Sequence, residues 1–173
     1  MNIHNQRVLI TGGGSGIGLA LAAAFLREGN QVFIAGRNLE KLNSAVRRHP
    51  GLIPVSCDIS SAADAERVAA WTDKEHGGVQ ILVNNAAIGS PYTFLGDPDA
   101  AAKAEREILT NLVGTIRLTQ RFLPQLLRQP RAAIVTITSG LAVAPAPGTP
   151  GYSASKAGLH SFLVSLRAQL RRT

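Results

Sequence analysis

The sequence predicts an α/β fold in which helices cover both faces of a doubly wound parallel sheet. Five short runs have the composition of buried strands, because they are rich in β-branched and aliphatic residues and lack polar alternation. Stretches with helical spacing separate them, and strands that alternate with helices form right-handed βαβ units. The expected strands are Arg7–Thr11, Gln31–Ala35, Leu52–Ser56, Gln80–Asn84 and Ala133–Thr138.

Five helices are expected between and after these strands. They are Gly16–Glu28, Leu39–Arg48, Ala62–Glu75, a long helix near Ala101–Leu127 and a last helix from about Ser153. Apolar residues of the last helix share one face, which is typical of a core or a subunit interface. These residues are Leu159, Phe162, Leu163, Leu166 and Leu170.

The composition is that of a globular chain and excludes several classes of protein. With 173 residues, of which 45% are hydrophobic and 17% charged, residues 1–173 are expected to form one domain. No apolar run reaches the roughly 18 residues of a membrane span, and the N-terminal apolar stretch is too short for a signal peptide. Cys57 is the only cysteine. It excludes an internal disulfide, fits a reducing cytoplasm, and is expected to be a small buried hydrophobe.

The net charge of +7 does not predict a nucleic-acid partner. The basic residues are spread over several segments, and no basic run is interleaved with aromatic residues. A solvated basic surface that partly serves an anionic cofactor is the favoured interpretation. No metal site is expected.

A glycine-rich turn follows the first strand directly. Glycine permits positive φ and close approach of the backbone to a pyrophosphate, and the next helix offers free N–H groups. The spacing fits T-G-x-x-x-G-x-G and not the strict G-x-G-x-x-G. A plain tight turn would also use glycines, but the position at the first strand-to-helix junction favours a Rossmann-type dinucleotide site. Its expected residues are Thr11, Gly12, Gly14, Ser15, Gly16, Ile17 and Gly18.

The residue after the second strand indicates which dinucleotide binds. A carboxylate there would bind the ribose 2′-hydroxyl of NAD, whereas an arginine accommodates the 2′-phosphate of NADP. This chain has Arg37, with Lys41 nearby and no carboxylate before Glu40. NADP(H) is therefore favoured over NAD(H), the alternative being that Arg37 is a solvent-exposed loop residue.

A second cluster has the residue types of a proton-transfer site. Tyr152 and Lys156 are spaced i, i+4, on one face of a helix. A tyrosine is a poor acid or base at neutral pH unless a nearby positive charge stabilises its phenolate, and a lysine one turn away supplies that charge. Ser139, expected at the end of the fifth strand, can donate a hydrogen bond to a substrate oxygen.

Together these motifs resemble the short-chain dehydrogenase/reductase family, from Gln6 to the end of the sequence. Beyond the glycine turn, Asp58 and Ile59 match the position that binds the adenine. Asn84-Asn85-Ala86-Ala87 matches the family's N-N-A-G with its last glycine replaced, and Asn85 and Ala86 are expected to line the cofactor. Thr136 stands where the family often has Asn. Asn111, Ser139, Tyr152 and Lys156 match the catalytic residues.

The resemblance implies an oxidoreductase that transfers hydride between NADP(H) and a carbonyl or alcohol substrate. Tyr152 would be the general acid/base, Lys156 would stabilise its phenolate and bind the nicotinamide ribose, and Ser139 would polarise the carbonyl. Asn111 would order a proton-relaying water. Two narrower alternatives stay open: Asn111 as a buried amide at a helix kink, and Asp58 as the N-cap of the next helix.

The resemblance leaves one alternative function and implies two further properties. A non-catalytic dinucleotide-binding module, such as a redox sensor or an assembly partner, is the alternative. Family members commonly pair through two long helices, here Ala101–Leu127 and Ser153–Arg172, so a homodimer or homotetramer is expected. Only five strands are counted where the doubly wound dinucleotide fold has six, so the natural protein is expected to continue beyond Thr173.

Overall fold

The computed structural model describes residues 3–171, which divide into two compact units. The first contains the chain up to Ala86 together with Arg117–Ile137. The second contains Ala87–Ile116 together with the chain from Thr138 onward. The organisation of residues 1–173 as one domain stays a prediction, and each unit is described by itself.

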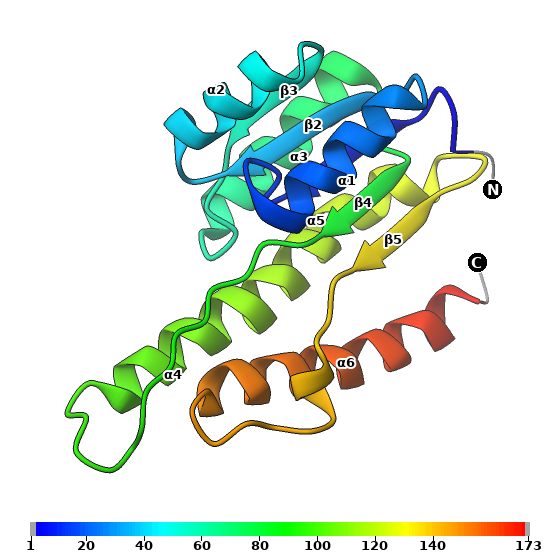
Figure 1. Ribbon diagram of the computed structural model, residues 1–173. Coiled ribbons are helices and arrows are strands. Elements are labelled where there is room, and N and C mark those ends of the chain that lie inside the picture. Colours follow the sequence, from blue (N-terminus) through cyan, green and yellow to red (C-terminus); the bar gives the residue numbers. More distant parts are fainter. Residues whose placement is uncertain (1–2, 172–173) are drawn as a thin grey trace. The chain divides into compact units, whose positions relative to one another are not determined.

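The first unit is built on the predicted parallel sheet (Figure 1). Its strands lie in the order β3-β2-β1-β4-β5, which is the order of the first five strands of the doubly wound dinucleotide fold. In the register, Thr11 of the central strand lies beside Ala35. The strands are β1 (Arg7–Thr11), β2 (Gln31–Gly36), β3 (Leu52–Ser56), β4 (Ile81–Asn84) and β5 (Ala133–Thr136).

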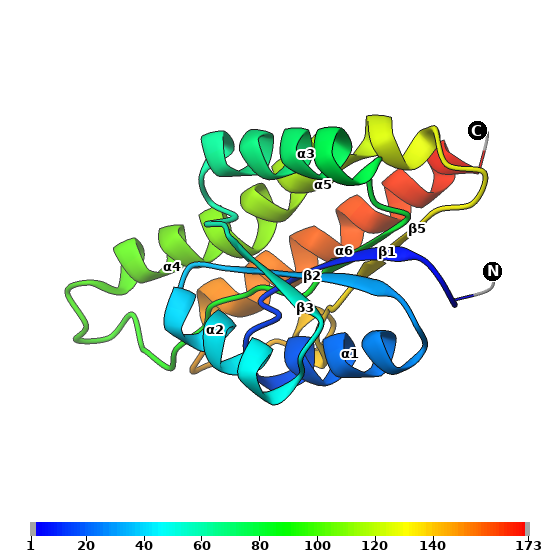
Figure 2. The same ribbon diagram turned by 90° about the horizontal axis from the view of Figure 1, so that it is seen from above.

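Helices cover both faces of this sheet, which explains the absence of polar alternation in its strands (Figure 2). On one face, α1 (Gly16–Arg27) and α2 (Leu39–Arg48) pack against Val8, Ile10 and their neighbours. On the other face, α3 (Ala62–His76) and α5 (Thr115–Leu127) pack against Leu9, Phe33 and Leu82. The bounds of α1, α2 and α3 agree with the prediction to within one residue.

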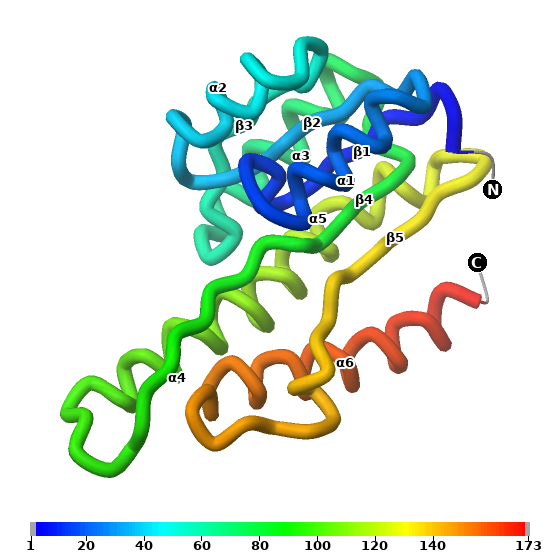
Figure 3. Tube along the Cα trace, viewed as in Figure 1, coloured from blue at the N-terminus to red at the C-terminus, as the bar shows by residue number. Residues whose placement is uncertain are grey.

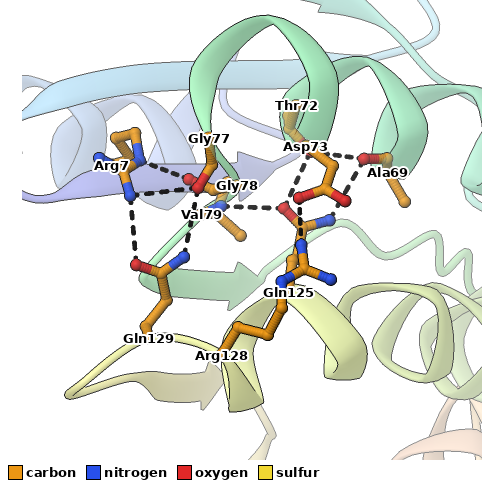
Figure 4. Close-up of polar contacts among 10 residues, drawn as sticks. All are labelled: Arg7, Ala69, Thr72, Asp73, Gly77, Gly78, Val79, Gln125, Arg128 and Gln129. Carbon is orange, nitrogen blue, oxygen red and sulfur yellow. Dashed lines mark hydrogen bonds and ion pairs between the residues drawn. The ribbon is translucent and has the colours of Figure 1, made fainter.

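A buried amide connects α3, α5 and the chain entering β4 (Figure 4). The carbonyl oxygen of Gln125 accepts hydrogen bonds from the Thr72 hydroxyl at 3.1 Å and the Val79 N–H at 2.9 Å. Its Nε2 donates to the carbonyl of Ala69. Beside it, Arg128 pairs with Asp73. Because Gln125 is only 3% exposed, these bonds satisfy a polar group that would otherwise be costly to bury.

The second unit contains α4 (Ala100–Ile108), a π-helical turn η1 (Leu109–Gly114), a 3₁₀ turn η2 (Gly140–Ala142) and α6 (Pro150–Leu170). The extended segment 87–99 runs alongside α4 (Figure 3). The helical stretch from Ala100 to Leu127 matches the expected long helix near Ala101–Leu127, but it is not α-helical throughout, because η1 interrupts it. A π turn adds a residue to the helical turn and is found mostly at functional sites.

Two predicted boundaries in the second half of the chain also differ. β5 ends at Thr136, so Ser139 does not end a strand; it is the N-cap of η2. α6 begins at Pro150, three residues before the expected start, because proline is favoured in the first turn of a helix. The expected end of this helix at Arg172 lies outside the described residues.

Candidate active site

The glycine turn between β1 and α1 is open at the start of the helix. Ser15 is the N-cap residue of α1, and Ser15, Gly16 and Ile17 are exposed, Ile17 at 63%. Gly16 has φ +53°, and nothing lies within 4 Å of the position where its Cβ would be. Free N–H groups and the positive end of the helix dipole therefore face an open space, an arrangement that suits a phosphate.

The other side of the turn is closed tightly against β4. A Cβ on Gly18 would lie 2.4 Å from the carbonyl oxygen of Gly12 and 2.5 Å from Asn85 Nδ2. The Thr11 hydroxyl, 2% exposed, accepts hydrogen bonds from the N–H groups of Asn85 and Ala86, both at 3.0 Å. Asn85 Nδ2 donates to the Thr11 carbonyl at 2.9 Å. The side chains of Thr11 and Asn85 thus support the turn by bonding the ends of β1 and β4 together.

Arg37 and Asp58 lie side by side, just after β2 and β3. The Nη1 atom of Arg37 is 4.0 Å from Asp58 Oδ2, and both side chains are partly exposed. The other carboxylate oxygen of Asp58 accepts from the Ser60 N–H at 2.9 Å and the Ser60 hydroxyl at 2.6 Å. Asp58 is not the N-cap of α3, as the alternative required, because Ser61 holds that position.

Two neighbouring residues point into the core. Ile59 is 6% exposed and belongs to the apolar cluster beneath α3, so only its backbone is placed to meet a cofactor. Cys57 is 2% exposed, and burial raises the pKa of its thiol to about 11. The thiol is therefore un-ionised at neutral pH, as expected of a buried hydrophobe and not of a nucleophile.

The four candidate catalytic residues all belong to the second unit. Tyr152 and Lys156 lie one turn apart on α6, and Lys156 Nζ is 5.7 Å from the centroid of the Tyr152 ring. The lysine is only 3% exposed, and this burial lowers its pKa. A cation held beside a phenol ring in a partly desolvated place is the arrangement that proton exchange by tyrosine requires.

Asn111 lies in the middle of the π turn and is fully buried. Its Oδ1 accepts from the Ile88 N–H at 2.8 Å, and its Nδ2 donates to the Ile88 carbonyl at 2.7 Å and to the Ser155 hydroxyl at 3.0 Å. The side chain therefore connects segment 87–99 to α6 three residues after Tyr152. Asn111 is thus a buried amide in an irregular helical turn, and its part in proton relay stays a prediction.

Ser139 begins the η2 turn, which packs against α6. Its hydroxyl oxygen accepts a hydrogen bond from the Leu141 N–H at 3.1 Å. Within residues 3–171 the hydroxyl donates to no other group. Its proton is thus available to a ligand oxygen.

A hollow of about 490 Å³ lies against the start of α6. Its lining comes from the proline-rich loop 141–150 and from α6, and consists of Leu141, Ala142, Pro145, Ala146, Pro147, Pro150, Ser153, Ala154 and Ala157. Segment Ile88–Ala100 contributes no residue to it. Instead Tyr92 is 7% exposed and bonds to Glu107, and Asp97 pairs with Lys103 at 2.6 Å.

Comparison with known proteins identifies the family. Residues 6–173 match the short chain dehydrogenase family. This chain is a short-chain dehydrogenase/reductase. It is 41% identical to the uncharacterized oxidoreductase DltE of Bacillus subtilis over 100% of this chain and 69% of the relative. It is 31% identical to dehydrogenase/reductase SDR family member 4 of Bos taurus over 97% of this chain and 61% of the relative.

Solved structures agree with this membership. The L-sorbose reductase of Gluconobacter frateurii, in complex with NADPH and L-sorbose, matches with a TM-score of 0.91 and 29% identity, over 99% of this chain and 66% of the reductase. An NADPH-bound short-chain oxidoreductase of Pseudomonas aeruginosa, described as having an atypical catalytic center, matches with a TM-score of 0.88 and 31% identity, over 98% of this chain and 68% of the neighbour. This short-chain dehydrogenase thus spans about two thirds of the length of these relatives.

The residues of this short-chain dehydrogenase fit a dinucleotide. The open space at Gly16, where a side chain would intrude, suits a pyrophosphate, and Arg37 and Asp58 offer charges at the adjoining strand ends. Among residues 3–171, no group of His, Cys, Asp and Glu could hold a metal ion. No helix in the described part of the chain is long and apolar enough to cross a membrane.

Sequence reasoning missed two features of this site. The first is the π turn that holds Asn111, and the second is Glu107, a carboxylate that is only 3% exposed. The sequence does offer a signal for a shared face, because Glu107 and Asn111 are spaced i, i+4. Nothing in the sequence indicates that Glu107 is buried.

Proposed function

We propose that this short-chain dehydrogenase transfers hydride between NADP(H) and a small carbonyl or alcohol substrate, with Tyr152 as the general acid/base. The observation that carries the proposal is the buried Lys156 ammonium, 5.7 Å from the Tyr152 ring on the same face of α6. A module that only binds a dinucleotide has no need of a cation held in this position, whereas proton transfer by a tyrosine does.

Each catalytic side chain has a defined task in this scheme. NADP(H), when bound, supplies or accepts the hydride. Tyr152 gives its hydroxyl proton to the carbonyl oxygen during reduction and takes a proton from the alcohol during oxidation. Lys156 stabilises the negative charge that develops on the phenol oxygen and bonds the nicotinamide ribose. Ser139 donates its free hydroxyl proton to the substrate oxygen, which orients and polarises the carbonyl.

Asn111 supports the catalytic side chains by hydrogen bonds to neighbouring segments of the protein. Its side-chain amide bonds Ile88 and Ser155, so it fixes the segment beside α6. Its expected part in proton relay is to order the water chain that reloads the proton.

NADP(H) is the proposed cofactor because the guanidinium of Arg37 is 57% exposed beside the end of β2. A planar guanidinium forms bidentate, charge-assisted hydrogen bonds with phosphate. NADPH in the Gluconobacter frateurii and Pseudomonas aeruginosa neighbours supports the same choice.

Two substitutions test the assignment of the chemistry. Tyr152→Phe removes one oxygen and should abolish turnover while leaving the fold and NADPH affinity unchanged. Lys156→Ala should damage both turnover and NADPH binding, because its proposed roles include the ribose. Lys74→Ala is the matched control, since Lys74 has a side chain that is 85% exposed. Turnover by Tyr152→Phe equal to that of the wild type would refute the acid/base assignment.

We also propose a homodimer or homotetramer in a reducing cytoplasm. Support for the assembly comes from apolar side chains left exposed on the helices of the second unit, Leu109 at 43% and Val164 at 59%. Light scattering at micromolar concentration tests it, and a monomeric mass would contradict it.

A further inference from the structure

We propose that Glu107 is a positioning residue that holds the Tyr152 ring in place through Tyr92 and the loop 88–92. This inference rests on the proposed function, because it assigns Glu107 a task toward the proposed acid/base. Glu107 itself lies in α4 and forms its hydrogen bonds with Ser90 and Tyr92, not with Tyr152 or Lys156, so its effect must pass through other groups.

The first step is the burial of the Glu107 carboxylate. It is 3% exposed, and none of the ion pairs among residues 3–171 includes it. Each carboxylate oxygen instead accepts one hydrogen bond: Oε1 from the Ser90 N–H at 3.0 Å and Oε2 from the Tyr92 hydroxyl at 3.0 Å. Burying an ionisable group is costly unless it is hydrogen-bonded, so both bonds are needed to keep Glu107 where it is.

The second step leads from Tyr92 to the start of α6. The Tyr92 hydroxyl donates to Glu107 and accepts from the Gly151 N–H at 3.1 Å, and Gly151 directly precedes Tyr152. The Tyr92 N–H donates to the Gly148 carbonyl at 2.9 Å. Burial and the bond to Glu107 raise the pKa of Tyr92, so its hydroxyl stays protonated and remains a donor.

Gly151 packs so closely against Tyr92 and Glu107 that a displacement of this pair must also displace the start of α6. A Cβ on Gly151 would lie 2.4 Å from the Tyr92 hydroxyl oxygen, 2.6 Å from Glu107 Oε2 and 2.7 Å from the Cα of Ala104. No side chain fits at this point, and the first turn of α6 is therefore seated directly on the Glu107–Tyr92 pair.

The third step places the loop against the ring of Tyr152. A Cβ on Gly89 would be 2.7 Å from Tyr152 Cδ2, so the backbone of Gly89 packs directly against the Tyr152 ring. Asn111 holds the residue before Gly89 by two hydrogen bonds to Ile88, and Glu107 holds the residue after it through Ser90. Two side chains spaced i, i+4 thus clamp the loop on either side of the glycine that contacts the ring.

The consequence is that Glu107 controls the orientation of Tyr152 and not the binding of NADP(H). A general acid that is displaced by about 1 Å from its productive position can lose a large part of its effect. Loosening the clamp should therefore lower kcat and leave KM and the NADPH dissociation constant almost unchanged.

Tyr92→Phe and Glu107→Gln test this with little change in shape. Tyr92→Phe removes both bonds of the hydroxyl, and Glu107→Gln leaves a single carbonyl oxygen for two donors. Glu105→Gln is the matched control, because Glu105 is an exposed residue of the same helix. We expect kcat to fall by about tenfold or more in both test variants, with KM and NADPH affinity within about twofold of the wild type. The control should behave as the wild type does.

Two further readouts separate positioning from a merely structural role. The double variant should be no slower than the slower single variant, because both changes break the same connection. In protein labelled with ¹³C at the tyrosine ring, the Tyr152 signal should shift in both variants and not in Glu105→Gln. Tyr152→Phe assigns that signal, because it removes it from the spectrum. The same variant separately tests the proposed function: full activity in Tyr152→Phe would refute the role of Tyr152 as general acid/base, but not the positioning of its ring by Glu107.

Several results would overturn the proposal. One is a folded Tyr92→Phe variant whose kcat equals that of the wild type. Another is a double variant whose loss of kcat equals the product of the two single losses. A third is a ¹³C signal of Tyr152 that has the same position in the variants as in the wild type. Failure of both single variants to fold would also overturn it, because the pair would then be required for the fold and not for the orientation of the ring.

Discussion

Replacing Arg37 by aspartate should remove the preference for NADPH over NADH. In the structure the guanidinium is exposed and its nearest carboxylate oxygen, on Asp58, is 4.0 Å away. An exposed ion pair at this distance contributes at most about 0.5 kcal/mol, whereas hydrogen bonds to a charged group contribute about 1.5–3 kcal/mol. Exchanging the first for the second favours the 2′-phosphate by about 1–2.5 kcal/mol, and about 1.4 kcal/mol, in the lower part of this range, corresponds to about a tenfold preference for NADPH.

The assay is a fluorescence titration of each reduced cofactor at fixed ionic strength. The wild type should bind NADPH about tenfold more tightly than NADH, and Arg37→Asp should bind NADH equally well or better, because a carboxylate repels the 2′-phosphate and accepts from a ribose hydroxyl. Arg47→Asp makes the same charge change at an exposed position in the last turn of α2 and serves as the control. Tighter binding of NADH by the wild type would refute the reasoning.

Three other predictions follow from the packing. Gly18→Ala should weaken NADPH binding by about tenfold or more in the same titration, because its Cβ would lie 2.4 Å from the Gly12 carbonyl oxygen and must displace the turn; unchanged affinity would contradict this. Cys57 should resist thiol reagents in the folded protein at pH 8.5 and react once urea unfolds it, since its pKa is about 11. Because folding favours the neutral thiol, the contribution of Cys57 to stability should be present below about pH 8.5 and lost as the pH rises toward 11. Gln125→Leu should lower the free energy of unfolding by about 1–3 kcal/mol in urea titrations, because it leaves the Val79 N–H buried without its acceptor.

The sheet could be predicted from the sequence because local composition decides it. Runs such as Arg7–Thr11 are apolar on both faces, and such runs have few alternatives to a strand covered on two sides. The glycine turn and the Tyr152–Lys156 pair could also be predicted from the sequence, because each depends on spacing within a few residues.

Features that depend on contacts between distant segments could not be predicted. The apolar pattern of residues 101–127 gives no local sign of the π turn, which coincides with the hydrogen bonds of Asn111 to the distant residues Ile88 and Ser155. A lone glutamate on a helix is usually solvated, and only the arrival of Ser90 and Tyr92 makes Glu107 a buried residue. The early start of α6, in contrast, had a local signal in Pro150 that favours the first helical turn.

The most direct test of the central claim follows the hydride itself. The protein is incubated with NADPH deuterated at the transferable position and with a panel of small ketones and aldehydes, and the products are analysed by mass spectrometry. The account predicts an alcohol that carries one deuterium at the former carbonyl carbon, formed by the wild type and not by Tyr152→Phe. NADPH binding without deuterium transfer to any member of the panel would contradict it and would favour a dinucleotide-binding module without catalytic activity.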